Sequence, residues 1–198
     1  MNFSLNSIEE KFLEPIIERI KSLPRGNAPI IVAIDGRCAS GKTTAATVIG
    51  EKLGCVVFHM DDFFLRPGQR TAERLDTPGG NVDYERFLDE ILRPLGNGER
   101  EISYRPFSCK TQSLCDAVKV SATPICIVEG SYSCHPALRD YYDLKVFLTA
   151  SPSEQMSRII LREGEKVAEV FKEKWIPLEE KYFSSCEVEK NCDIIIET

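Results

Sequence analysis

The chain has 198 residues, of which 42% are hydrophobic and 28% are charged, and its formal net charge is −6. This length suits one well-filled domain, and the acidic balance argues against a general nucleic-acid surface, because binding to a phosphate backbone draws on clustered Lys and Arg. No apolar run reaches the length of a membrane span and the first residues do not resemble a secretory signal, so we expect a cytoplasmic protein without membrane contact. The eight cysteines form no C-x-x-C pair and no zinc spacing, which is typical of free thiols in a reducing compartment.

The first predicted element is an amphipathic helix over residues 7–23. Its apolar side chains recur at helical spacing. The predicted stripe consists of Ile8, Phe12, Ile16, Ile20 and Leu23. A segment bounded by two prolines then ends the helix and leads into the first strand.

A phosphate-binding loop follows this first strand, which is predicted at Ile30–Ile34. Residues 36–43 match the pattern G-x-x-x-x-G-K-[ST], and a helix is predicted directly after them, so the motif has the strand and the helix that it needs. Its glycines let backbone N–H groups surround a phosphate, Lys42 adds a positive charge and Thr43 offers a hydroxyl to Mg²⁺. Cys38 lies inside the loop, where we expect alkylation to block nucleotide binding. The residues expected to bind the nucleotide are Gly36, Arg37, Cys38, Ala39, Ser40, Gly41, Lys42, Thr43 and Thr44.

Four more strands are predicted further along the chain, with helical stretches between most of them. They cover residues 56–59, 125–128, 144–148 and 193–196. Strands that alternate with helices form a parallel sheet covered on both faces, so we expect one α/β domain over residues 1–198 with a five-stranded parallel sheet. Ligands of such sheets gather at the carboxyl ends of the strands.

The segment 101–122 differs in character from the rest of the chain. Two short strand candidates, 102–104 and 118–120, flank a polar loop. We interpret this pattern as a β-hairpin inserted between elements of the sheet. No internal repeat and no linker long enough to separate two domains is visible.

Carboxylates follow two of the predicted strands at the edge where ligands gather. Asp61 follows the second strand and could accept a hydroxyl proton or hold a water bound to Mg²⁺, although an Asp at this place can also be a turn or helix-cap residue. Glu129 ends the next strand and is a candidate to bind Mg²⁺ or position water, with a surface turn as the alternative. Together with Thr43, these two residues form the predicted metal site.

The order of these motifs resembles the uridine kinase family and the nicotinamide riboside kinases. The resemblance implies a P-loop kinase fold with a helical lid and transfer of the γ-phosphate of ATP to a primary hydroxyl of a nucleoside, with Mg²⁺. It also implies that Asp61 is the catalytic aspartate and that Lys42 and Thr43 contact phosphate and metal. The matching segments are residues 36–43, Asp61-Asp62-Phe63-Phe64, Glu129-Gly130, Tyr142-Asp143-Leu144, the Arg158 and Arg162 segment, Trp175-x-Pro177 and Tyr182.

The same resemblance implies an acceptor-binding insertion over about residues 76–122. Asp83 falls where relatives hold the ribose hydroxyls, although it would also serve as the N-cap of a following helix. Tyr104, Arg105 and Phe107 fall where uridine kinases hold the base, although packing within the hairpin explains the two aromatic residues almost as well. Asp61 and Glu129 are expected to face the same acceptor.

A lid is predicted over about residues 158–175. Arg158 and Arg162 are four residues apart and share one helix face, where they would neutralise charge on the transferring phosphoryl group and exclude water. Solvated surface arginines are the alternative. Trp175 is expected to pack beneath the lid.

The sequence therefore predicts an enzyme that phosphorylates a small, nucleoside-like acceptor with ATP and Mg²⁺, either as a monomer or as a homo-oligomer. Two alternatives remain open. One is a kinase for another small acceptor, such as nicotinamide riboside or pantothenate, and the other is an ATP-binding regulatory module. The D-x-x-G sequence at Asp76–Gly79 does not follow an apolar strand and no guanine signature is present, which argues against a GTPase.

Overall fold

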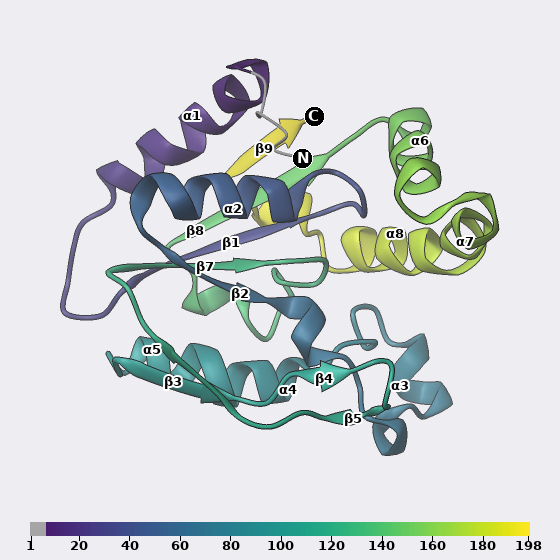
Figure 1. Cartoon of the computed structure of the whole chain (residues 1–198), viewed down its shortest axis with the longest axis horizontal. Helices are drawn as coiled ribbons and strands as arrows, with labels where there is room; N and C mark the ends of the chain where they lie inside the picture. Colours follow the sequence, from purple (N-terminus) through teal and green to yellow (C-terminus); the bar gives the residue numbers. More distant parts are fainter. Residues whose placement is uncertain (1–6) are drawn as a thin grey trace.

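A wholly parallel five-stranded sheet lies at the centre of the computed structural model, which describes residues 7–198 and their side chains from residue 12 onward (Figure 1). The strand order is β2-β7-β1-β8-β9. This arrangement confirms the predicted α/β fold, and each strand begins within one residue of its predicted start. The strands are β1 Ile30–Gly36, β2 Val56–His59, β7 Ile125–Glu129, β8 Leu144–Thr149 and β9 Ile194–Glu197.

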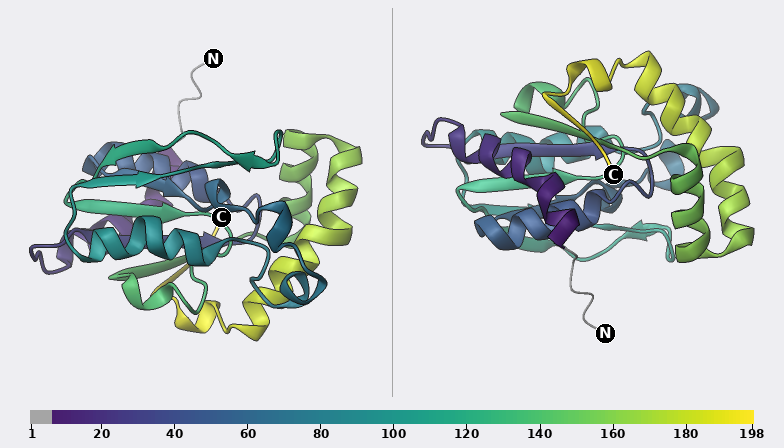
Figure 2. Two further views of the ribbon diagram at one scale, coloured as in Figure 1. Left: turned by 90° about the horizontal axis from the view of Figure 1, so that it is seen from below. Right: turned by 90° about the horizontal axis from the view of Figure 1, so that it is seen from above.

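Helices cover both faces of this sheet, and further helices lie at the carboxyl ends of its strands (Figures 1 and 2). The π-helical turns Leu88–Leu92 and Phe171–Trp175 join α4 to α5 and α7 to α8. Short 3-10 turns complete the connections at residues 60–63, 67–69, 139–141 and 189–191. The α-helices are α1 Ser7–Ser22, α2 Lys42–Leu53, α3 Ala72–Asp76, α4 Tyr84–Phe87, α5 Arg93–Gly96, α6 Pro152–Glu163, α7 Glu165–Val170 and α8 Ile176–Ser185.

The sheet separates two apolar cores. Alternate residues of β1 point to opposite faces, so Val32 packs with α1 and α2 while Ile31 and Ala33 pack with the other layer. That second layer contains large aromatic side chains, including Phe58 and Phe63. Because both faces of β1 are buried, the strand is apolar without interruption from Ile30 to Ile34.

The apolar face of α1 differs from the predicted stripe. The helix buries Leu13, Ile16, Ile17 and Ile20, whereas the side chain of Phe12 is 47% exposed. The buried face therefore differs from the predicted stripe, because it is centred on Ile16 and Ile17 and excludes Phe12. The predicted contribution of Ile8 lies outside the side chains that the structure describes.

The predicted insertion forms two small antiparallel ladders beneath the main sheet (Figure 1). Strand β3 Glu101–Tyr104 pairs with β6 Val118–Ser121, which confirms the predicted hairpin. Within its loop, β4 Phe107–Ser108 pairs with β5 Ser113–Leu114, and this ladder was not predicted. Over residues 7–198, no helix combines the length and the apolar character that crossing a membrane requires.

Candidate active site

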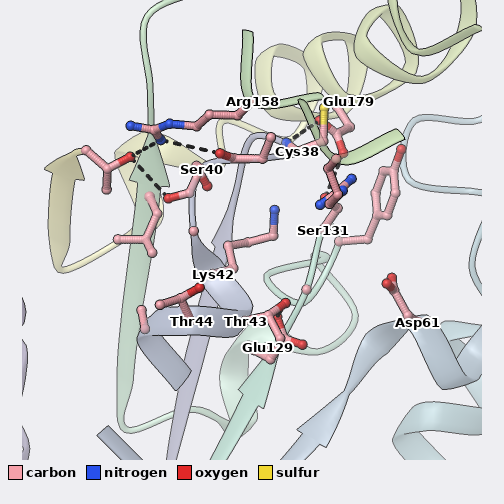
Figure 3. A pocket seen from close by; sticks show the side chains of 18 of the residues that line it. Cys38, Ser40, Lys42, Thr43, Thr44, Asp61, Glu129, Ser131, Arg158 and Glu179 are labelled. Atoms are coloured by element: carbon pink, nitrogen blue, oxygen red, sulfur yellow. Dashed lines mark hydrogen bonds between the residues drawn. The ribbon is translucent and has the colours of Figure 1, made fainter. Parts of the chain in front are cut away.

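A cavity of about 820 Å³ opens at the carboxyl ends of the parallel strands (Figure 3). The phosphate-binding loop, residues 36–43, forms its floor together with the start of α2. The cavity is also lined by α1, the segment after β2, the end of β7, the lid helices and the end of β9. This is the place where open parallel sheets bind ligands.

Glycines and a buried lysine shape the phosphate-binding loop. A Cβ on Gly36 would lie 1.9 Å from the Leu148 carbonyl oxygen, and Gly36 has φ +140°, so only glycine fits there. Ala39 and Gly41 adopt left-handed backbone conformations, which turn successive N–H groups inward as in an anion-binding nest. Lys42 is buried, and its Nζ donates hydrogen bonds to the carbonyl oxygens of Gly36 at 2.9 Å and Arg37 at 2.8 Å. The loop therefore has the shape and charge that a phosphate requires.

Two predicted nucleotide-binding residues have side chains that serve the fold. Arg37 turns away from the cavity and binds Glu180, with Nε 2.7 Å from Oε1, and Glu189 at 3.0 Å. The Arg37 side chain therefore does not line the cavity. The Cys38 thiol is buried and receives a hydrogen bond from Gln155 Nε2 at 3.1 Å. Burial raises the pKa of the Cys38 thiol to about 12, so its reactive thiolate form is scarce and the expected sensitivity to alkylation is disfavoured.

A buried carboxylate, not predicted from the sequence, holds the start of the loop. Asp35 Oδ1 accepts hydrogen bonds from the backbone N–H groups of Gly36 at 2.7 Å and Tyr132 at 3.2 Å. Its Oδ2 accepts from the N–H of Cys134 at 2.8 Å and from the Tyr182 hydroxyl at 2.8 Å. Burial raises the pKa of Asp35 to about 6, although these donors act in the opposite direction. Asp35 thus ties β1, the segment after β7 and α8 together.

The predicted metal and catalytic residues lie around the same cavity. Thr43 Oγ1 donates to Glu129 Oε2 at 3.2 Å, and His59 Nδ1 lies 2.6 Å from Glu129 Oε1. Asp61 lines the cavity beyond them and is accessible to solvent there. The cavity walls partly desolvate its carboxylate, and this effect together with the nearby Glu129 raises the pKa of Asp61, while Lys42 opposes it. The structure thus brings Thr43, Asp61 and Glu129 together, as predicted.

This set of oxygen atoms fits Mg²⁺. The Thr43 hydroxyl and the Glu129 carboxylate are adjacent at the start of α2, and both are hard oxygen ligands. Within residues 7–198, no three His, Cys, Asp or Glu side chains converge closely enough to hold a metal by themselves. Mg²⁺ commonly takes only one or two protein oxygens and completes its shell with water and substrate phosphates.

The lid helices bring both predicted arginines to the cavity. Arg158 Nη1 donates to Thr198 Oγ1 at 2.9 Å and lies 3.4 Å from the Ala39 carbonyl oxygen. Arg162 is more exposed and lies over the ring of Phe171, with its guanidinium carbon 6.0 Å from the ring centroid. Trp175, which was expected to pack beneath the lid, forms part of the cavity wall.

Glu179 is a second residue that sequence reasoning missed. It lies on α8, is 5% exposed and lines the cavity. Its Oε2 accepts a hydrogen bond from the N–H of Cys38 at 2.9 Å, and its Oε1 accepts one from Ser131 Oγ at 2.7 Å (Figure 3). No pattern in the sequence distinguishes this glutamate from the exposed ones around it.

Four residues predicted to bind the acceptor do not line the cavity. Asp83 is 1% exposed and caps α4, where its side chain accepts a hydrogen bond from the N–H of Arg86 at 3.3 Å. Arg105 binds backbone carbonyl oxygens of its own hairpin. Tyr104 and Phe107 are buried, the first stacked on Phe63 and the second beneath Arg70. The structure shows the alternatives given for three of these residues, the N-cap for Asp83 and packing for Tyr104 and Phe107, and the roles of all four toward an acceptor stay predictions.

Comparison with known sequences finds relatives that are named as uridine kinases. The chain is 26% identical over 144 residues to Uridine kinase-like protein 3 from Arabidopsis thaliana and 27% identical over 145 residues to Uridine-cytidine kinase B from Dictyostelium discoideum. Each alignment covers 68% of this chain, but only 31% of the first protein and 58% of the second. The chain therefore spans less than two thirds of the length of these relatives. No protein-family model matches it.

Solved structures share the fold over nearly the whole chain. A structure described as a possible uridine kinase from Bacillus stearothermophilus has a TM-score of 0.71 at 18% identity and covers 96% of this chain and 99% of that one. A phosphoribulokinase from Rhodobacter spheroides has a TM-score of 0.58 at 15% identity and covers 87% and 71%. Identities this low establish the fold alone. The chain therefore has the P-loop kinase fold and is similar in sequence to uridine kinase-like proteins of that fold, as the order of its motifs predicted.

Proposed function

We propose that this protein is a phosphotransferase that moves the γ-phosphate of ATP to a hydroxyl of a small acceptor. One observation carries the proposal: a phosphate-binding loop with its lysine and a carboxylate, Asp61, line the same cavity at the carboxyl ends of a parallel sheet. Within this cavity Asp61 is a solvent-accessible carboxylate that could accept the proton of a hydroxyl. The uridine kinase-like sequence relatives support the same reaction.

Each group of residues around the cavity has its own role in the proposed reaction. The backbone N–H groups of the loop hold the phosphates, and Lys42, Arg158 and Arg162 stabilise the charge that spreads over the transferring group. Asp61 orients the acceptor hydroxyl and takes its proton. Thr43 and Glu129, with Asp61 beside them, would hold Mg²⁺, and the ion would supply positive charge at the outer phosphates when bound. The lid excludes water, which would otherwise compete as acceptor.

A nucleoside is the acceptor that we propose. The names of the sequence relatives support this choice, and nicotinamide riboside or pantothenate remain the alternatives within the enzyme class. An ATP-binding regulatory module is the alternative outside it. The predicted cytosolic location and self-association stay predictions.

The test is ADP release by the purified protein with Mg²⁺ and ATP across uridine, cytidine, adenosine, nicotinamide riboside and pantothenate, each against a blank without acceptor. We expect one nucleoside to stimulate release. Stimulation by a different acceptor would keep the phosphotransferase and replace the nucleoside. ATP binding without stimulation by any acceptor would favour the regulatory module.

A further inference from the structure

The cavity has one end lined by cationic side chains. Its opposite end, which we call the acceptor end, has no cationic side chain of its own. Lys42, Arg158 and Arg162 line the part next to the phosphate-binding loop and the lid. In Figure 3, Asp61 and Glu179 lie on the other side of Lys42 from Arg158. Beyond Lys42, no lysine or arginine of the described chain lines this acceptor end. The cavity is also lined by the Glu129 carboxylate and by neutral side chains, among them Phe64, Asn81, Ser131 and Tyr132.

Glu179 places a second carboxylate beside Asp61 in the wall of this end. Both of its carboxylate oxygens accept hydrogen bonds, from the Cys38 N–H at 2.9 Å and from the Ser131 hydroxyl at 2.7 Å. These two bonds fix the carboxylate in the cavity wall, and neither comes from a cation. Among the side chains that the structure describes, Glu179 takes part in no ion pair.

Four arginines on neighbouring elements are held by other carboxylates, and Arg70 is held by the Leu65 carbonyl oxygen. A guanidinium is the side chain that recognises a carboxylate or phosphate with two parallel hydrogen bonds, so an acceptor anion would need one of them. Turning one of the four toward the cavity would break an existing ion pair. The pairs are Arg37 with Glu180 and Glu189, Arg66 and Arg86 with Asp83, and Arg74 with Glu85.

An anionic acceptor would therefore face two carboxylates at this end, with Lys42 as the nearest cationic side chain among the described residues that line the cavity. Asp61 and Glu179 repel it in a cavity from which water is partly excluded, where charges interact more strongly than in water. An uncharged alcohol avoids this repulsion, and a cation would be attracted by both carboxylates and by the faces of Phe64 and Tyr132. The fold does not decide this point, because the phosphoribulokinase that shares it is named for a phosphorylated acceptor.

We propose that the site accepts an uncharged or cationic alcohol and rejects acceptors that carry a carboxylate or phosphate, with Glu179 as the residue that sets this preference. The inference rests on the proposed phosphotransferase function. It makes pantothenate, one of the alternative acceptors, a poor substrate.

Matched pairs of acceptors that differ in one acidic group test the proposal. Suitable pairs are nicotinamide riboside with nicotinic acid riboside, panthenol with pantothenate, and uridine with 3′-UMP, in which the 5′-hydroxyl stays free. ADP release over the blank without acceptor gives kcat/KM for each member. For every pair that shows turnover, we expect the acidic member to be at least about 100-fold poorer.

Glu179→Gln separates the charge of this residue from its hydrogen bonds. A glutamine can still accept from the Cys38 N–H and can donate to the Ser131 hydroxyl, so the loop keeps its support. We expect the ratio of kcat/KM between the acidic and the neutral member of a pair to rise at least about 10-fold in this variant. Glu173→Gln is the matched control, because Glu173 lies exposed on the helical turn directly before α8; this control should leave the ratio unchanged.

The outcomes separate the inference from the function on which it rests. Turnover of an acidic member at a rate equal to or above its neutral partner would overturn the inference while the phosphotransferase stands. If Glu179→Gln keeps its thermal midpoint and ATP affinity but leaves the ratio of kcat/KM between acidic and neutral acceptors unchanged, Glu179 does not set the preference. ATP binding without release for any member would overturn both the proposed function and the inference.

Discussion

Asp35 and Asp61 are two aspartates near the same loop with opposite surroundings. Asp35 is fully buried and accepts four hydrogen bonds, so its oxygens are committed to the fold. The carboxylate of Asp61 lies open to the cavity, and within the described residues it makes no hydrogen bond. Its oxygens therefore remain available to an incoming hydroxyl, which is the condition for a proton acceptor.

Asp61→Asn tests whether this carboxylate accepts the proton of the acceptor hydroxyl. The amide keeps the size of the side chain but accepts a proton poorly, so we expect kcat to fall by about 10²- to 10⁴-fold. The affinity for Mg²⁺ and ATP should change only a few-fold, because the loop is untouched. Steady-state ADP release and nucleotide titration measure the two quantities. Near-normal turnover would contradict the assignment.

Asp35 makes stability depend on pH. Its pKa of about 6 in the folded protein exceeds the ordinary value of 3.8, so the folded state binds the proton more tightly than the unfolded chain. The buried charge therefore destabilises the fold above pH 6, and the penalty is relieved as the pH falls from 6 toward 3.8. Relative to Asp35→Asn, the free energy of unfolding of the wild type should rise by about 2 kcal/mol between about pH 7.5 and about pH 4.5. Urea unfolding at both pH values checks this; a constant difference would contradict it.

At the scale of elements, the phosphate-binding loop depends on how closely β1 approaches β8. The N–H of Arg37 donates to the Leu148 carbonyl oxygen at 3.1 Å, directly beside Gly36. The loop therefore leaves the sheet at a point where two backbones are in contact and no side chain fits between them. The position of the loop is set by the sheet and not by the loop sequence alone.

Gly36→Ala should separate these two strands. The new methyl group would clash with the Leu148 carbonyl oxygen and the residue would have to keep φ +140°, so we expect a loss of about 2–4 kcal/mol in the free energy of unfolding together with weaker nucleotide binding. Gly68→Ala is the control, because a Cβ there meets no atom within 4 Å. Denaturant unfolding of both variants gives the comparison. Equal free energies of unfolding for the two variants would contradict this expectation and show that β8 can shift to make room for the methyl group.

The elements that could be predicted from the sequence are those with a clear local pattern of residues. The central strands are continuous β-branched runs, and the loop motif carries its strand and helix beside it. The ladder of β4 and β5 was missed because two-residue strands have no periodicity to read. The buried face of α1 was misplaced because Phe12 and Leu13 are adjacent apolar residues, and only the packing decides which of them turns inward.

At the scale of the whole molecule, the candidate site is assembled from distant parts of the chain. Tyr182 and Asp35 are 147 residues apart, and Glu179 and Cys38 are 141 residues apart. No local pattern marks Glu179 or Asp35, because their importance arises from contacts that exist only after folding. The carboxylates at strand ends could be predicted because the topology of a parallel sheet brings strand ends together.

Nucleotide binding should therefore stabilise the entire fold. A ligand that binds only the folded state at about 100 times its Kd adds about 2.7 kcal/mol. For a chain of this size we expect the thermal midpoint to rise by about 5–11 °C with Mg²⁺ and ATP. Lys42→Ala should abolish most of this shift, because the positive charge at the phosphates is lost. Differential scanning fluorimetry measures both proteins, and an equal shift in the variant would contradict the role of Lys42.

The contacts of Thr198 have a consequence for the order in which the chain is made. Its Oγ1 lies 3.1 Å from the Ser40 carbonyl oxygen and 2.9 Å from Arg158 Nη1, so the segment after β9 supports both the phosphate-binding loop and the lid. A ribosome synthesises the loop early and this support more than 150 residues later. A nascent chain thus carries the complete loop sequence before these supporting contacts can form, and we expect nucleotide to bind it weakly until β9 has emerged and docked.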